Sequence, residues 1–247
     1  MKSIMATRIT MMVLTIILST TTTFSQYDSL RIKSSILNRS VDVFLYQNGD
    51  PTENRSITYI TDGKKMIQNG VIKRITELTK KNEIPHGFFA FVSTIDQQSS
   101  KDFRDEYFFC NSDYVRFFEE ELLPQVESSI DNTFTSENRN LLGVSYGGMN
   151  AAYFSTQTDS IKNFAMLSPY IGPCGTLSNK ILTSNQKDFR LFISSGINDA
   201  EEYVNILNEA YSTKTDKIKL YQTSGGHDFD NWIDQIGVAL NFLSHKE

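Results

Sequence analysis

The sequence predicts an α/β fold with a mostly parallel central sheet and helices on both of its faces. Short apolar runs bounded by turn residues recur along the chain, and segments with helical spacing separate several of them. One such run, Leu141–Val144, leads directly into a Gly-x-Ser-x-Gly turn. Strands that alternate with helices form a parallel sheet that is buried on both faces. A chain of 247 residues suits one such domain, because folds of this class often reach about 250 residues as a single unit.

The N-terminus has the pattern of a secretory signal peptide. A basic start precedes the apolar run Ile9–Leu18, and small or polar residues follow as far as Ser25. We expect a signal peptide over residues 1–25, cleaved near the Ser25–Gln26 bond, and a single domain over residues 26–247. The apolar run is shorter than the roughly 20 residues of a membrane span, so we expect a secreted or periplasmic protein without a membrane anchor after cleavage.

Strands and helices are predicted from the spacing of apolar residues along the chain. The strands are the apolar runs Val41–Tyr46, Ile57–Ile60, Phe88–Val92, Leu141–Val144, Phe164–Leu167, Phe189–Ile193 and Ile218–Tyr221. The helices, with apolar residues three or four apart, run from Val115 to Val126, from Val204 to Tyr211 and from Trp232 to Leu243. Pro124 is expected to kink or end the first helix. Val41–Tyr46 is expected to pair antiparallel at the edge of the sheet, with Asn48–Pro51 as its turn.

Charge and cysteine content narrow the classes of function. The formal net charge is −5, and loss of Lys2 and Arg8 with the signal peptide lowers it to −7. We therefore expect no general attraction for nucleic acid or for anionic lipid. Cys110 and Cys174 permit one disulfide in an oxidising compartment but do not require it, and their spacing does not resemble a metal site. Nothing in the sequence indicates an oligomeric state.

The segment around Ser145 has the pattern of a nucleophile elbow, in which a strand turns sharply into a helix and lifts a serine hydroxyl above the sheet. Gly143 and Gly147 leave room for that turn. The amide N–H of Tyr146 would then face the position of a tetrahedral oxyanion. The pentapeptide also occurs by chance in ordinary turns, so the flanking strand and the partners downstream decide between the two interpretations.

A serine hydroxyl needs a base to act as a nucleophile, and the base needs a group that orients it. Of the three histidines, His227 is the candidate base, because it lies between paired glycines and the last helix, after the last predicted strand. His86 lies in a turn that leads into a strand, and His245 lies in the C-terminal tail.

The orienting acid is expected between the serine and the histidine in the chain, after the preceding strand. Asp199 is the candidate, because it ends the loop that follows Phe189–Ile193. Its alternative role is to cap the next helix, in which case Glu201 or Glu202 would substitute as the acid. A second oxyanion donor is expected from the N–H of Gly63 or Lys64, after an early strand; a simple Asp-Gly turn is the alternative there.

With these residues assigned, the chain resembles the putative esterase family of α/β-hydrolases. That family includes enterochelin esterases, feruloyl and acetyl-xylan esterases, S-formylglutathione hydrolases and mycolyltransferases. The similar segments are Tyr59–Gly63, Phe118–Glu127, Gly196–Asp199 and Gly226–Trp232. The resemblance implies that Ser145, Asp199 and His227 are the catalytic triad and that Tyr146 is an oxyanion donor.

The chain departs from this family in the segment that often lines the substrate pocket, where an Arg-x-x-Asp-Tyr-Thr-Pro-like sequence is replaced by Lys101–Phe109 without Thr-Pro. Arg104 is a candidate to bind a carboxylate or catecholate of the substrate, or is a surface arginine paired with an acid. Trp232 borders the acyl pocket or anchors the last helix in the core.

The function that these residues predict is that of a serine carboxylic ester hydrolase that forms an acyl-enzyme and uses no cofactor and no metal. The expected partner is a small-molecule or polysaccharide-linked ester: a siderophore-type ester, a feruloyl or acetyl ester of a polysaccharide, or a similar small ester. An acyltransferase with the same triad and an inactive, ligand-binding relative are the alternatives.

Overall fold

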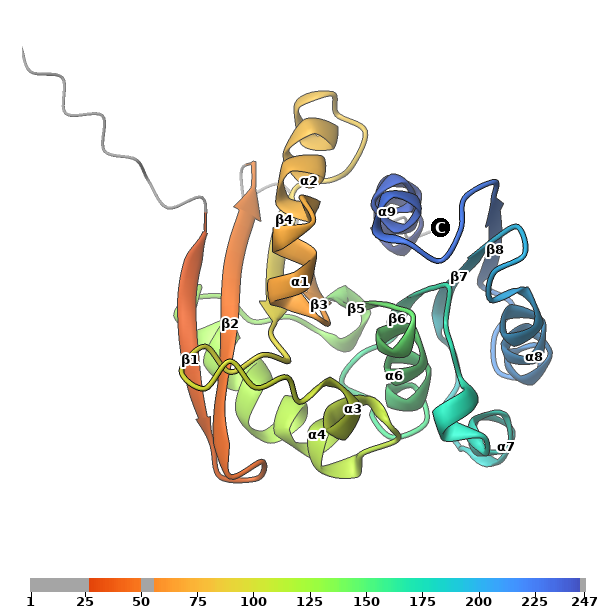
Figure 1. Cartoon of the computed structure of the whole chain (residues 1–247), viewed down its shortest axis with the longest axis horizontal. Coiled ribbons are helices and arrows are strands. Elements are labelled where there is room, and N and C mark those ends of the chain that lie inside the picture. Colours follow the sequence, from red (N-terminus) through yellow and green to blue (C-terminus); the bar gives the residue numbers. More distant parts are fainter. Residues whose placement is uncertain (1–26, 50–55, 245–247) are drawn as a thin grey trace, which may run out of the picture.

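An eight-stranded sheet runs through the centre of the computed structural model, which describes residues 27–49 and 56–244 (Figure 1). Its strand order is β1-β2-β4-β3-β5-β6-β7-β8. The strands are β1 (Asp28–Ser34), β2 (Arg39–Asn48), β3 (Ile57–Ile60), β4 (Gly87–Val92), β5 (Arg139–Val144), β6 (Asn163–Leu167), β7 (Arg190–Gly196) and β8 (Ile218–Thr223). Strands β3 to β8 are parallel to their neighbours in this group, whereas β2 pairs antiparallel with both β1 and β4. The predicted mostly parallel sheet is confirmed.

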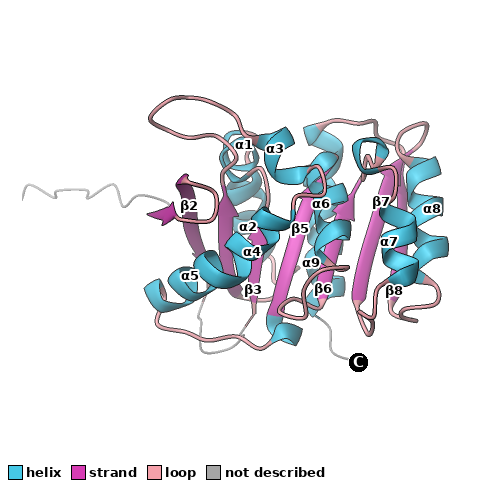
Figure 2. Cartoon of the chain, turned by 90° about the horizontal axis from the view of Figure 1, so that it is seen from below, coloured by secondary structure: helices cyan, strands magenta, loops and turns pink. Residues whose placement is uncertain are grey.

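Helices cover both faces of this sheet (Figures 1 and 2). One face carries α1 (Gly63–Gln68), α2 (Val71–Lys80) and α9 (Phe229–Ser244). The other face carries α3 (Arg104–Phe108), α4 (Ser112–Phe117), α5 (Leu123–Ser129), α6 (Tyr146–Phe154), α7 (Leu177–Thr183) and α8 (Glu201–Tyr211). Because successive side chains of a strand point to opposite faces, Leu141 belongs to one hydrophobic core and Leu142 to the other.

The edge of the sheet differs from the prediction. Val41–Tyr46 lies within β2 and pairs antiparallel with β4 as expected, but it is not the edge strand. The unpredicted strand β1 lies outside it, with Ile32 opposite Val41. An edge strand exposes one side to solvent, so β1 is largely polar and lacks a continuous apolar run. The predicted turn Asn48–Pro51 extends beyond the described residues.

Pro124 does not end its helix. The chain stays helical from α4 through a π-helical turn, Phe118–Leu122, into α5. In that turn the N–H of Leu123 bonds to the carbonyl of Phe118, five residues earlier. A proline has no N–H and crowds the carbonyl four residues before it, and the wider turn accommodates both effects.

The chain turns sharply where several central strands end. Positive φ angles, which are unusual for residues other than glycine, occur at Asp62 after β3, Ser145 after β5, Ser168 after β6 and Asn198 after β7, with φ of 56°, 56°, 45° and 60°. Residues other than glycine rarely adopt this region, and they cluster at functional sites when they do. These turns place four loops at the carboxyl end of the sheet.

Within residues 27–49 and 56–244, no helix has the length and apolar character that crossing a membrane requires. The predicted signal peptide, its cleavage site and His245 lie outside the described residues.

Candidate active site

Ser145 occupies a sharp turn between β5 and α6, with φ 56° and ψ −119°. The glycines on either side make this turn possible. A Cβ on Gly143 would lie 2.1 Å from the carbonyl oxygen of Gly147, and one on Gly147 would lie 2.4 Å from Oγ1 of Thr61. The predicted need for space at both glycines is confirmed. The turn places the serine hydroxyl at the carboxyl end of the sheet.

Ser145, His227 and Asp199 form a continuous chain of hydrogen bonds. Nε2 of His227 lies 2.9 Å from Oγ of Ser145, and Nδ1 of His227 lies 2.5 Å from Oδ1 of Asp199. Oδ2 of Asp199 accepts a hydrogen bond of 3.3 Å from the N–H of Gly196. The three side chains come from the loops after β5, β8 and β7, and the structure brings them together although 82 residues separate the serine from the histidine.

The alternative acids and bases lie elsewhere. Glu201 and Glu202 are exposed on the first turn of α8. Asp199 makes no capping bond to that helix, whose N-cap residue is Ala200. His86 lies beside Gly49, next to the amino end of β4.

The histidine loop packs closely against its neighbours. A Cβ on Gly196 would lie 1.9 Å from the carbonyl oxygen of Gly225, so the loops after β7 and β8 touch through their glycines. Asn231 Nδ2 donates to the carbonyl of Gly226 at 2.7 Å and holds the residue before His227. Asn231 was not predicted, because its position in α9 carries no catalytic signal.

Trp232 is buried and packs against the imidazole. Its ring meets the His227 ring edge to face, with centroids 4.9 Å apart. Its Nε1–H donates to Oγ of the buried Ser168 at 2.9 Å. Trp232 therefore lies in the core beneath the histidine, and Ser168, which sequence reasoning missed, fixes the orientation of the indole.

The residues expected to supply oxyanion donors lie at the same end of the sheet. Tyr146 is the first residue of α6, so its N–H has no carbonyl partner within the helix. Gly63 and Lys64 begin α1, and a Cβ on Gly63 would lie 2.3 Å from the backbone of Phe91. Thr61 joins the two segments, because its N–H bonds to the carbonyl of Leu142 at 3.0 Å and its side chain faces Gly147.

Arg104 pairs with an acid, but that acid is buried. Its Nε lies 2.7 Å and 2.9 Å from the two carboxylate oxygens of Asp62. Burial raises the pKa of the Asp62 carboxyl above its usual value, and the positive charge of Arg104 opposes that shift. The ion pair therefore fixes the Arg104 side chain, most of which is buried.

An aromatic rim lies beside Ser145; we define it as Phe109, Tyr146, Tyr170 and Tyr203. Neighbouring rings in this order meet edge to face, with centroids 5.1, 5.6 and 5.0 Å apart. Phe109 is 37% exposed and Tyr170 is 41% exposed, so large apolar surface faces solvent next to the serine. Exposed apolar surface of this kind is typical of a binding site.

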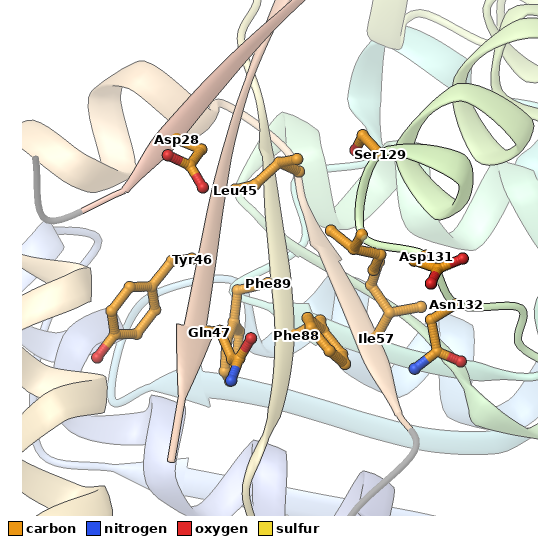
Figure 3. Close-up of a pocket in the computed structure, with 11 residues that line it drawn as sticks. Asp28, Leu45, Tyr46, Gln47, Ile57, Phe88, Phe89, Ser129, Asp131 and Asn132 are labelled. Carbon is orange, nitrogen blue, oxygen red and sulfur yellow. The ribbon is translucent and has the colours of Figure 1, made fainter. Parts of the chain in front are cut away.

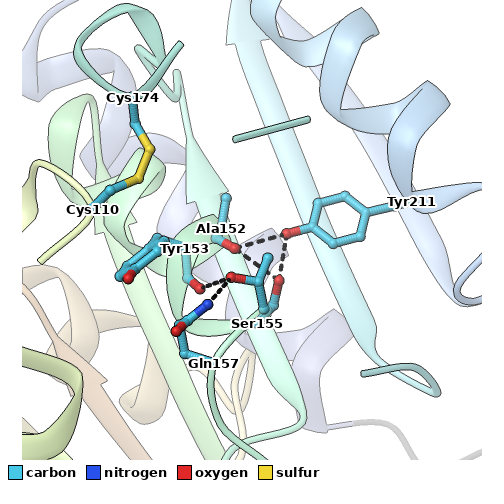
Figure 4. The surroundings of a disulfide bond; sticks show 8 residues. Cys110, Ala152, Tyr153, Ser155, Gln157, Cys174 and Tyr211 are labelled. Carbon is cyan, nitrogen blue, oxygen red and sulfur yellow. Dashed lines mark hydrogen bonds between the residues drawn. A yellow bond between two sulfur atoms is a disulfide. The ribbon is translucent and has the colours of Figure 1, made fainter. Parts of the chain in front are cut away.

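A disulfide between Cys110 and Cys174 joins the loop that carries Phe109 to the loop that carries Tyr170 (Figure 4). Cys110 follows Phe109 directly, and Cys174 lies four residues after Tyr170. The pairing that the sequence permitted is therefore present.

A cavity of about 630 Å³ lies away from this site (Figure 3). Ile57 and Phe88, at the amino ends of β3 and β4, contribute to its lining. Ser145 lies at the carboxyl ends of the parallel strands, so this cavity does not face the serine.

Comparison with known proteins places the chain among esterases. The sequence model of the family described as "Putative esterase" matches residues 34–243. An iron(III) enterobactin esterase of Escherichia coli O6:H1 is 29% identical over 123 residues, which cover 49% of this chain and 30% of that protein. The match thus spans less than a third of the length of that curated relative.

Two solved structures share the fold. The enterobactin esterase of Shigella flexneri, crystallised in the presence of enterobactin, has a TM-score of 0.79 at 23% identity and covers 88% of this chain and 58% of that chain. A ferulic acid esterase has a TM-score of 0.70 at 14% identity and covers 88% of this chain and 97% of that chain. These likenesses show the α/β-hydrolase fold.

Proposed function

The chain belongs to the "Putative esterase" family, and from this premise we propose that it hydrolyses carboxylic esters through an acyl-enzyme formed on Ser145. The contact that carries the proposal is the 2.9 Å distance between Oγ of Ser145 and Nε2 of His227, with Asp199 on the other ring nitrogen. A nucleophile, a base and an orienting acid in hydrogen-bond contact are the groups that acyl transfer requires.

The reaction follows from this geometry. Oγ of Ser145 attacks the ester carbonyl while Nε2 of His227 takes its proton, and the N–H groups of Tyr146 and of Gly63 or Lys64 bind the oxyanion. His227 then protonates the leaving alcohol as the carbon–oxygen bond breaks. Water attacks the acyl-enzyme, His227 takes its proton and returns one to Ser145, and the carboxylic acid leaves. The His227 side chain is 39% exposed, which gives water access and favours hydrolysis over transfer to another alcohol.

Substitution of the serine tests the mechanism. We expect Ser145→Ala to lower kcat by about 10⁶, as in serine-protease knockouts, because the remaining groups have no nucleophile to activate. A fluorophosphonate probe should label the wild-type protein on Ser145 and leave the variant unlabelled. Equal melting temperatures of the two proteins would show that the fold is intact. Hydrolysis by Ser145→Ala at the wild-type rate would refute the proposal.

The aromatic rim favours a substrate ester that carries an aromatic or other large apolar group. Phe109, Tyr146 and Tyr170 offer ring faces and edges next to Ser145, and such groups bind planar apolar ligands. Siderophore-type and feruloyl esters have this character, and acetyl esters do not. We expect kcat/KM for a feruloyl or catecholate ester to exceed that for the corresponding acetyl ester at least tenfold. A preference for acetyl esters would contradict this choice of substrate.

We also propose that residues 26–247 are secreted as one domain after removal of residues 1–25. The disulfide supports an oxidising compartment. N-terminal sequencing of the exported protein should begin at or next to Gln26.

A further inference from the structure

The ion pair between Asp62 and Arg104 joins two segments that are distant in the sequence. Asp62 ends the turn after β3 and is 1% exposed, and Arg104 begins α3 with its side chain 18% exposed. Both carboxylate oxygens of Asp62 lie within 2.9 Å of Nε of Arg104. Figure 2 shows α1 and α3 at the same end of the sheet. A buried pair with this geometry holds its two segments at a fixed separation.

The same arginine also contacts both neighbours of Ser145. Its Nη2 donates to the carbonyl of Val144 at 3.3 Å, and its guanidinium carbon lies 4.9 Å from the centre of the Tyr146 ring. Val144 is the last residue of β5 and Tyr146 is the first of α6. Arg104 therefore contacts the backbone before Ser145 and the side chain after it, through one hydrogen bond and one cation–π contact.

Asp62 stands directly before the other segment expected to bind the oxyanion. Its backbone has φ 56°, and Gly63 and Lys64 follow it as the first residues of α1. Its Oδ2 would lie 3.5 Å from a Cβ on Gly147, so the carboxylate also faces the start of α6. One ion pair thus connects the two backbone segments whose N–H groups are proposed above to bind the oxyanion.

We propose that Asp62 and Arg104 are positioning residues that set the separation between the Tyr146 N–H and the N–H of Gly63 or Lys64, and so complete the oxyanion site. This inference rests on the function proposed above. Oxyanion donors act through fixed geometry, so a small displacement weakens binding of the tetrahedral state more than binding of the planar ester. Neither side chain touches the reacting atoms in this role.

Two variants test the inference. Asn tolerates the left-handed backbone of Asp62, so Asp62→Asn removes the carboxylate charge and preserves the turn. Arg104→Lys keeps a positive charge but replaces two separate nitrogens, Nε toward Asp62 and Nη2 toward the Val144 carbonyl, with a single one. We expect each variant to lower kcat for a neutral acetyl ester by about 10- to 100-fold at nearly unchanged KM. The affinity for butylboronic acid, which forms a tetrahedral adduct with the serine oxygen, should fall by the same factor.

The chain offers two matched controls. Lys65→Met removes the other ion pair between the same segments, Lys65 Nζ to Asp102 Oδ2 at 2.7 Å, which does not reach the nucleophile turn. Glu127→Gln weakens a buried pair of the same kind at the opposite end of β5, where Nε of Arg139 lies 2.6 Å from the Glu127 carboxylate. Glu127→Gln should lower the melting temperature and leave kcat unchanged. Lys65→Met should change neither kcat nor boronate affinity by more than about twofold.

The outcomes separate this inference from its alternatives. The inference would be overturned if folded Asp62→Asn kept the wild-type kcat and boronate affinity. It would also be overturned if Glu127→Gln lost as much kcat as Asp62→Asn. If Arg104 instead binds the substrate, Arg104→Lys would raise KM for an anionic ester and leave neutral esters unaffected, which also contradicts a positioning role. If Asp62→Asn does not fold, Arg104→Lys alone decides by the same comparison. If the proposed function itself is wrong, the wild-type protein will hydrolyse esters no faster than Ser145→Ala, and that result differs from each of the outcomes above.

Discussion

Two side chains that do not react hold His227 in its orientation. The carboxylate of Asp199 accepts from Nδ1, which fixes the proton on that nitrogen and leaves Nε2 as an acceptor toward Ser145. The ring of Trp232 packs against the imidazole, and its own orientation is set by Ser168. The imidazole is thus presented to the serine in a single tautomer and a single direction.

Replacement of Asp199 by Asn tests the tautomer argument. The amide can donate a hydrogen bond to Nδ1, and the ring proton then lies on Nε2. A protonated Nε2 of a neutral imidazole cannot accept the proton of Ser145. We expect kcat to fall on the order of 10⁴, the loss seen for the same change in a serine protease. Glu202→Gln is the matched control, because Glu202 is exposed on α8, and its kcat should stay within about twofold. The assignment of the acid is wrong if the two results are reversed.

Among the connecting elements, the Cys110–Cys174 disulfide determines how the aromatic rim is assembled. It links the loop after α3 to the loop after β6, through two cysteines that are 64 residues apart in the sequence. Phe109 and Tyr170 lie on these loops, and each ring meets the Tyr146 ring edge to face. The disulfide bonds the two loops directly, and the ring contacts of Phe109 and Tyr170 with Tyr146 link them a second time.

Removal of this disulfide should affect stability and substrate preference together. We expect the double variant Cys110→Ser, Cys174→Ser to lose about 2 to 4 kcal/mol in free energy of unfolding, because a long loop is no longer closed in the unfolded chain. KM for an aromatic ester should rise severalfold as the two loops separate. KM for an acetyl ester, which does not need the rim, should stay the same. Equal changes in KM for both esters would show that the rim does not bind the aromatic group.

Strands with a continuous apolar run could be predicted from the sequence, and the edge strand β1, which lacks such a run, could not. Each strand from β2 to β8 overlaps a predicted apolar run. The side chains of β2 to β7 contact a core on either face, whereas the edge strand β8 has no fully buried residue and was predicted from its alternating apolar residues alone. Strand β1 was missed because its charged residues face solvent, with Arg31 bonded to Asp42 at 2.7 Å. Helix α2 was not predicted, although its buried residues Val71, Ile75 and Leu78 have the spacing of a helix face.

The same distinction applies within the site. Ser145, Asp199 and His227 each lie in a loop with glycines at characteristic positions, so local sequence was enough to select them. Asp62 and Arg104 are 42 residues apart, and nothing local shows that the arginine contacts that carboxylate instead of a substrate. Their pairing depends on how α1 and α3 pack over the end of the sheet, which is a property of the assembled fold.

On the scale of the whole molecule, four buried tyrosines make the free energy of unfolding depend on pH in the alkaline range. Burial raises the pKa of Tyr107 to about 12, and it raises the pKa values of Tyr59, Tyr114 and Tyr211 above 10 as well. Each phenol therefore keeps its proton in the folded protein at a pH where it ionises in the unfolded chain. The resulting stabilisation is fully present below about pH 10 and is lost as the pH rises through the folded-state pKa values.

The Tyr114 hydroxyl has no hydrogen-bond partner among the described residues, whereas the Tyr211 hydroxyl bonds to Ser155 at 2.7 Å. Removal of the Tyr114 hydroxyl therefore tests the effect of pH on stability without breaking a hydrogen bond. We expect Tyr114→Phe to match or exceed the wild-type free energy of unfolding at pH 8, since a buried unsatisfied polar group is removed. Above pH 10 its stability should decline less steeply than that of the wild type, by up to about 1.4 kcal/mol per pH unit, because one fewer phenol ionises on unfolding. Urea unfolding at pH 8, 9, 10 and 11 gives both slopes. Parallel curves for the two proteins would mean that Tyr114 ionises equally in both states, and the link between its burial and alkaline stability would then be wrong.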